Sequence, residues 1–183
     1  MAGQKMRRRD LFGGSLNVSI PERCSDISEL RQVPDHQEVF ADPDTDQSVI
    51  VEIVERMDIA DTDSARQHFA ELSESNNAIH SSVMETGTKL TSQGYTVYYA
   101  VGTQTVAKFK DDISDANLVE VRIFIIRIPL HDADIIISVN SPIKIAPRSS
   151  SQHCSPTDPA ANSILADAII SSFSIENLSL LFG

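Results

Sequence analysis

The sequence predicts an α+β fold: an α-β-α sandwich in which a central antiparallel sheet is flanked by helices. Three observations support this class. Several apolar segments alternate with the two-residue period of strands, whereas only two segments repeat at helical spacing. Asn117–Pro129 is apolar on both of its faces, as expected for a strand that is covered on both sides. The length of 183 residues is enough for one domain with a real core.

The first half of the chain predicts a hairpin and one main helix. The expected elements are a half-buried strand over Ser15–Pro21, one or two helical turns over Cys24–Arg31 capped by Ser25 or Asp26, a hairpin of Gln37–Ala41 and Ser48–Arg56, and a helix over about 64–76. The hairpin follows from the turn-forming residues 42–46 between the two strands. The helix follows from Ala65, Phe69 and Leu72, which make one apolar stripe.

The second half is richer in strands. The expected elements are strands over Ser81–Leu90, Tyr95–Ala107, Asn117–Pro129 and Ala133–Asn140, a loop over 141–158, and a helix that begins after Asp158. The short turn 130–132 predicts that the last two strands pair with each other. Asp158 followed by Pro159 is typical of a helix N-terminus. The apolar tail Ile175–Phe182 is expected to dock on the fold.

The chain is strongly acidic, with a formal net charge of −11 and a pI of about 4.7. Residues 25–74 hold 14 acidic and three basic side chains, so this segment alone carries the net charge of the whole chain. Nucleic-acid backbones and anionic membranes would be repelled, which favours a basic protein partner. No apolar run is long enough to span a membrane.

Neither the N-terminus nor the two cysteines predicts a catalytic or disulfide-bonded site. Residues 1–10 are basic without apolar periodicity and predict a flexible start, with residues 11–183 as the single folded domain. The basic residues 5–9 are consistent with either a solvated tail or a short nuclear-import patch. Cys24 and Cys154 are too few for a disulfide framework and are expected to be free thiols.

Asp35 and Glu38 form the most informative pair of polar residues, in a turn that begins at Pro34 and leads into a strand. The pair fits a recognition surface, a turn in which Asp35 caps backbone N–H groups, or an acid–base pair of a small hydrolase that uses a distant His or Cys. The five histidines have no metal-ligand spacing, and the chain has no nucleophile, phosphate-loop or dinucleotide motif. Recognition is therefore favoured, with no metal and no cofactor expected.

Four stretches resemble the Ran guanine-nucleotide release factors, the Mog family. They are Leu11-Phe-Gly-Gly14, Asp26-Ile-Ser-Glu-Leu-Arg31, Val33-Pro-Asp-His-Gln-Glu-Val-Phe40 and Asp46-Gln-Ser-Val-Ile-Val-Glu52. The resemblance is specific over residues 11–56 and looser over 57–183, where the strand order and the terminal Leu181-Phe-Gly183 still fit. The chain has His36 where this family usually has Asn.

The resemblance implies a PsbP-like fold, named after the photosystem II extrinsic subunit P. It also implies binding to the small GTPase Ran, release of its bound guanine nucleotide, and a role in nuclear protein import. The protein is expected to be a monomer and to occur in the nucleus and cytoplasm. Carried over by position, the implied Ran-contacting residues are Asp26, Glu29, Asp35 and Glu38. An alternative of the same fold is a plastid photosystem accessory protein, but the ten-residue basic start is too short for a transit peptide.

Overall fold

The computed structural model describes residues 4–108 and 112–183. Its strands are β1 (Met6–Leu11), β2 (Leu16–Pro21), β3 (Ser25–Asp26), β4 (Gln37–Ala41), β5 (Ser48–Glu55), β6 (His80–Leu90), β7 (Thr96–Val106), β8 (Asn117–Ile128), β9 (Ala133–Lys144) and β10 (Ser174–Ile175). Its α-helices are α1 (Asp61–Ser75), α2 (Pro159–Ser172) and α3 (Ser179–Phe182), and short 3₁₀ helices are η1 (Phe12–Gly14), η2 (Ile27–Glu29), η3 (Ile113–Asp115) and η4 (Pro129–His131).

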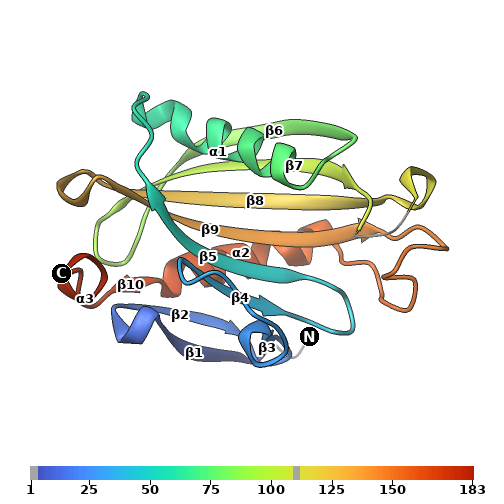
Figure 1. Ribbon diagram of the computed structural model, residues 1–183, viewed down its shortest axis with the longest axis horizontal. Helices are drawn as coiled ribbons and strands as arrows, with labels where there is room; N and C mark the ends of the chain where they lie inside the picture. The colour runs from blue at the N-terminus through green and yellow to red at the C-terminus, as the bar shows by residue number, and fades with distance from the viewer. Residues whose placement is uncertain (1–3, 109–111) are drawn as a thin grey trace.

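The strands form two antiparallel sheets (Figure 1). The large sheet has the order β3-β4-β5-β9-β8-β7-β6, and the small sheet has the order β1-β2-β10. Helix α1 packs on β6, β7 and β8, whereas α2 packs on β2, β8 and β9. The predicted α+β class with helices on both faces of an antiparallel sheet is therefore confirmed. The small sheet, which lies on the α2 side, was not expected from the sequence.

Alternating residues of the central strands build two separate cores. Phe124 and Ile126 of β8 pack toward α2, together with Ile169 and Phe173. Ile123 and Ile125 of the same strand pack toward α1. Successive side chains of a strand point to opposite faces, so a strand that is apolar at consecutive positions must be covered twice. The double coverage predicted from residues 117–129 is confirmed.

The hairpins are also confirmed, with small changes at their ends. β4 pairs with β5 from Gln37↔Glu52 to Ala41↔Ser48, and β8 pairs with β9 around the turn at η4. β9 continues to Lys144, so the loop begins four residues later than the predicted start at residue 141. The Asp158 side chain accepts a hydrogen bond from the Ala161 N–H at 2.9 Å, which confirms the predicted start of α2.

Of two expectations for the first 31 residues, one is wrong and one is confirmed in part. Residues 6–10 are not flexible, because β1 pairs with β2 from Met6↔Pro21 to Leu11↔Leu16. The Arg9 guanidinium also lies 5.6 Å from the centroid of the Phe40 ring. Although β2 is the next strand along the chain, β1 is basic and lacks apolar alternation, so a hydrophobic pattern does not predict it. The helical turns predicted over 24–31 are confirmed in part: Ile27–Glu29 form the single 3₁₀ turn η2, which Asp26 caps as expected, but Ser25 and Asp26 form β3.

Removing residues 1–9 is expected to lower the free energy of unfolding by roughly 2–3 kcal/mol. The deletion removes most of β1, its ladder to β2 and the contact between Arg9 and Phe40. Urea unfolding of the truncated and full chains measures the difference. Deletion of residues 1–4, which precede β1, is the matched control. Equal stability of both truncations would show that β1 contributes nothing to the fold.

Among the described residues, no helix is long and apolar enough to cross a membrane.

Candidate functional site

The four implied contact residues lie along the β3 end of the large sheet. Asp26 belongs to β3 and pairs in register with Phe40 of β4. Its carboxylate caps η2 by accepting hydrogen bonds from the Ser28 N–H at 2.9 Å and the Ser28 hydroxyl at 2.6 Å. Glu29 ends η2 and is exposed. We call the segment 25–41, which contains β3, η2 and β4, the acidic edge.

Asp35 and Glu38 differ in their surroundings. Asp35 is exposed, and its side chain has no partner in the described part of the chain, so the expected capping role is not realised. Glu38 is half-buried, and its carboxylate accepts a hydrogen bond from the Phe12 N–H at 2.9 Å. Phe12 has a positive φ of 48°, a strained conformation for a residue with a side chain. Glu38 therefore holds the η1 turn in place as well as adding charge.

The acidity of residues 25–74 is only partly available on the surface. Asp42 is 1% exposed and pairs with Arg23, while Asp46 pairs with Lys108. Asp61 pairs with Arg127. By contrast, Asp35 and Glu29 have no ion pair within the described residues and are exposed. The free negative charge of the acidic edge therefore lies on η2 and on the turn before β4.

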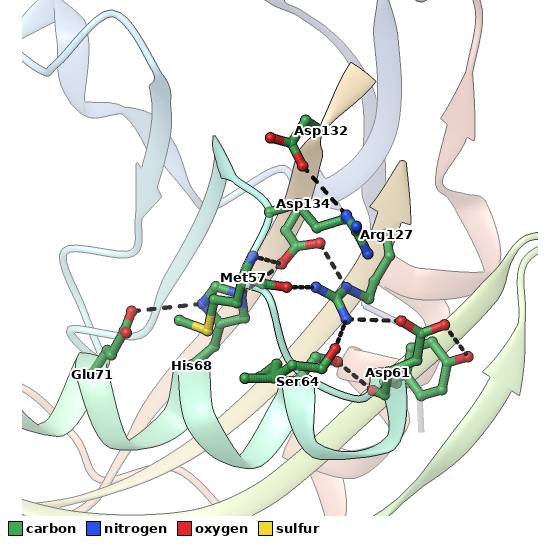
Figure 2. Close-up of polar contacts among 11 residues, drawn as sticks. Met57, Asp61, Ser64, His68, Glu71, Arg127, Asp132 and Asp134 are labelled. Carbon is green, nitrogen blue, oxygen red and sulfur yellow. Dashed lines mark hydrogen bonds and ion pairs between the residues drawn. The ribbon is translucent and has the colours of Figure 1, made fainter. Parts of the chain in front are cut away.

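A second polar cluster is buried between α1 and the β8–β9 hairpin (Figure 2). Arg127 Nε donates to Asp134 Oδ1 at 3.0 Å, and Nη1 donates to Asp61 Oδ1 and to the Ile59 carbonyl, each at 2.8 Å. Nη2 donates to the Met57 carbonyl. His68 Nε2 lies 3.0 Å from Asp134 Oδ2. These contacts join α1 and the loop before it to the sheet, so we call the cluster the buried ion network.

The buried ion network keeps Asp134 ionised although its side chain is fully buried. Burial by itself would raise the pKa of Asp134, but hydrogen bonds from His68 and Arg127 outweigh this and hold the pKa below its ordinary value of 3.8. The same balance lowers the pKa of Asp42, where burial is outweighed by hydrogen bonds from Thr45, the Asp44 N–H and Arg23. Both carboxylates therefore stabilise the folded state when ionised.

Acid is expected to remove the stabilisation that Asp134 provides. The pKa of Asp134 is lower in the folded chain than its ordinary value of 3.8, which it takes in the unfolded chain. Ionised Asp134 therefore contributes fully to the free energy of unfolding above pH 3.8. This contribution is lost as the pH falls through the pKa of the folded chain. Urea unfolding at several pH values between about 2 and 7 should show the stability gap between the parent and Asp134→Asn narrowing as the pH falls. A gap that stays constant with pH would contradict an ionised Asp134.

Sequence reasoning missed the buried ion network, although the sequence contains a signal for it. Arg127 and Asp134 are charges of opposite sign inside two apolar strands, on either side of a short turn. The hairpin register pairs these two residues with each other. A buried charge needs a partner, so the predicted hairpin was sufficient to pair them. His68 and Asp61 come from α1, and only the tertiary structure brings them there.

The hydrolase alternative finds no geometric support in the described residues. Neither thiol contacts a histidine: Cys24 is buried, and Cys154 donates to the Pro43 carbonyl. Burial raises the pKa of Cys24 to about 11 and, together with Asp46, raises the pKa of Cys154. Both shifts disfavour the reactive thiolate. Across residues 4–108 and 112–183, no three His, Cys, Asp or Glu side chains are grouped to hold a metal ion.

Comparisons with known proteins point to one family. Residues 9–142 match the family model described as Ran-interacting Mog1 protein. A Ran guanine nucleotide release factor of Danio rerio is 39% identical over 78% of this chain and 82% of its own length. A probable Ran guanine nucleotide release factor of Dictyostelium discoideum is 30% identical over 97% of both chains. The crystal structure of the Saccharomyces cerevisiae Ran-binding protein Mog1p has a TM-score of 0.75 at 24% identity and covers 99% of this chain and 100% of its own, which shows a shared fold.

Proposed function

The chain belongs to the Ran-interacting Mog1 protein family, and on that premise we propose that it binds the small GTPase Ran as a monomer and promotes release of the bound guanine nucleotide. It acts as a regulator without bond-making chemistry of its own. This activity supports nuclear protein import, in line with the relatives named nuclear import protein in two yeasts. We place its action in the nucleus and cytoplasm.

The acidic edge is the observation that carries this proposal. Asp26, Glu29, Asp35 and Glu38 lie within one short segment at the β3 end of the large sheet. Asp35 and Glu29 are exposed without a described partner, so pairing them with a basic surface breaks no internal bond. Complementary charges of this kind steer association and set the orientation of the complex.

Thermodynamic linkage supplies the mechanism of release. If the protein prefers Ran that has lost its nucleotide or opened its nucleotide site, it must weaken nucleotide binding by the same factor. The carboxylates of the acidic edge have two routes to this effect. They can pair with lysine or arginine side chains that otherwise hold phosphate, or they can disturb the ligands of the bound Mg²⁺.

Purified protein is expected to form a 1:1 complex with Ran and to accelerate loss of a fluorescent guanine nucleotide from it. The measurement is the release rate at increasing protein concentration, with unlabelled nucleotide as competitor. Saturation of the rate with concentration would reflect formation of the complex. An unchanged release rate at saturating protein would refute the proposed release of nucleotide. A separate measurement of Ran binding would then decide whether the two proteins still interact.

A further inference from the structure

The face of the large sheet that carries α1 is only half covered. Helix α1 packs on β6, β7 and β8, and leaves β4 and β5 open on the same face. Two adjoining hollows of about 660 and 720 Å³ lie there. They share the lining residues Ile50, Leu72, Ser75 and Asn76. We call this continuous depression between α1 and strands β4, β5 and β9 the α1 groove.

An amide group in the second hollow lacks an acceptor. Gln104 of β7 is fully buried and lines this hollow. Its Oε1 accepts a hydrogen bond from Asn76 Nδ2 at 3.0 Å, but its Nε2 has no partner among the residues that the structure describes. A buried donor without an acceptor is costly, so a ligand that offers a carbonyl oxygen is favoured. Asn140 and Asn117 add further amide groups to this hollow.

The first hollow is acidic. Glu52, Glu55 and Glu71 line it, and its arginine, Arg56, is engaged by Asp132 at 3.5 Å. The Glu52 carboxylate accepts a hydrogen bond from the neutral amide of Gln37 at 2.9 Å and has no cationic partner in the described chain. Charge complementarity therefore favours a lysine or arginine side chain in this half of the groove.

The α1 groove opens next to the acidic edge. Ile27 of η2 and Arg31 line the second hollow, and Val39 and Ala41 of β4 form part of its wall. A partner bound at the acidic edge therefore also reaches the groove. Apolar side chains of the groove floor, such as Ile50 and Leu72, are half-buried and provide the surface that an inserted chain would cover.

We propose that an extended segment of the bound GTPase inserts into the α1 groove, an inference that rests on the proposed function. A lysine or arginine of this segment pairs with Glu52 and Glu71, and a main-chain carbonyl accepts from Gln104 Nε2. Extended chains present such carbonyls at regular intervals, and the acidic first hollow sets the direction in which the segment lies. The groove thus holds part of the GTPase that the acidic edge has captured.

A tryptophan at Ser75 tests the groove by filling it from the side of α1. Ser75 is exposed and lines both hollows. We expect Ser75→Trp to weaken binding of Ran about tenfold or more in calorimetry. Gln67→Trp is the matched control, because Gln67 is exposed on the same helix and lines neither hollow. Its affinity should stay within about twofold of the parent, and both variants should unfold thermally like the parent.

Glu52→Gln tests the charge without changing the size of the side chain. We expect a loss of about three- to tenfold in affinity for Ran and a shallower dependence of affinity on salt. If Ser75→Trp fails to fold, Glu52→Gln decides alone. If the parent binds Ran and both groove variants bind like the parent, the groove inference is overturned and the proposed function stands. If the parent does not bind Ran, the proposed function fails and the inference fails with it.

Discussion

Replacing Arg127 by leucine is expected to lower the free energy of unfolding by about 3–5 kcal/mol. The Arg127 side chain is 3% exposed and donates to two carboxylates and two backbone carbonyls. Leucine leaves the fully buried Asp134 with only His68 and the Met57 N–H as partners. Two carbonyls in the loop before α1 also lose their donor. Urea unfolding monitored by circular dichroism measures the loss.

Two further variants distinguish the stability lost by breaking the buried ion network from the stability lost by removing any ion pair. Lys5→Met removes an ion pair with Glu22 in which the two side chains are 80% and 40% exposed, and it should cost no more than about 1 kcal/mol. Asp134→Leu combined with Arg127→Leu should recover part of the stability lost by the single variant, because no uncompensated buried charge remains. A loss below about 1 kcal/mol for Arg127→Leu would show that water replaces the guanidinium at little cost.

Changing the charge of the acidic edge at two positions is expected to weaken binding of Ran by about 2–5 kcal/mol, the cost of leaving desolvated cations of the partner unpaired. The variant is Asp35→Lys combined with Glu38→Gln. Asp35 is exposed without a described partner, so its reversal tests charge alone. Glu38 holds the Phe12 N–H, and glutamine keeps an oxygen acceptor there while removing the charge.

The measurement pairs calorimetry of Ran binding at two salt concentrations with thermal unfolding of the free protein. Glu85→Gln is the control, because Glu85 is exposed on β6, at the opposite edge of the large sheet from the acidic edge. This control should bind Ran like the parent. If the double variant also binds like the parent, the acidic edge is not the contact. If Glu38→Lys unfolds whereas Glu38→Gln does not, Glu38 serves mainly to hold the η1 turn.

Local patterns predicted most of the strands and both long helices, because the hydrogen bonds that form these elements join residues within a short stretch of chain. The Asp158–Pro159 start of α2 depends on bonds within the first helical turn. The β4–β5 and β8–β9 hairpins join strands that are neighbours in sequence. The patterns failed for two strands for different reasons: β10 joins β2 across more than 150 residues, whereas β1 pairs with its neighbour β2 but is a basic strand without apolar alternation.

The amino-acid sequence by itself determined the α+β class, the double coverage of β8 and the acidic character of residues 25–74. These properties follow from periodicity and composition, which act locally. Tertiary structure alone decided which carboxylates remain available, because Asp42, Asp46 and Asp61 are paired with bases far from them in sequence. It also bound Glu38 to the Phe12 N–H and placed α1 over only half of a sheet face. Side-chain partners and uncovered surfaces depend on how distant elements pack, and a one-dimensional pattern does not contain that information.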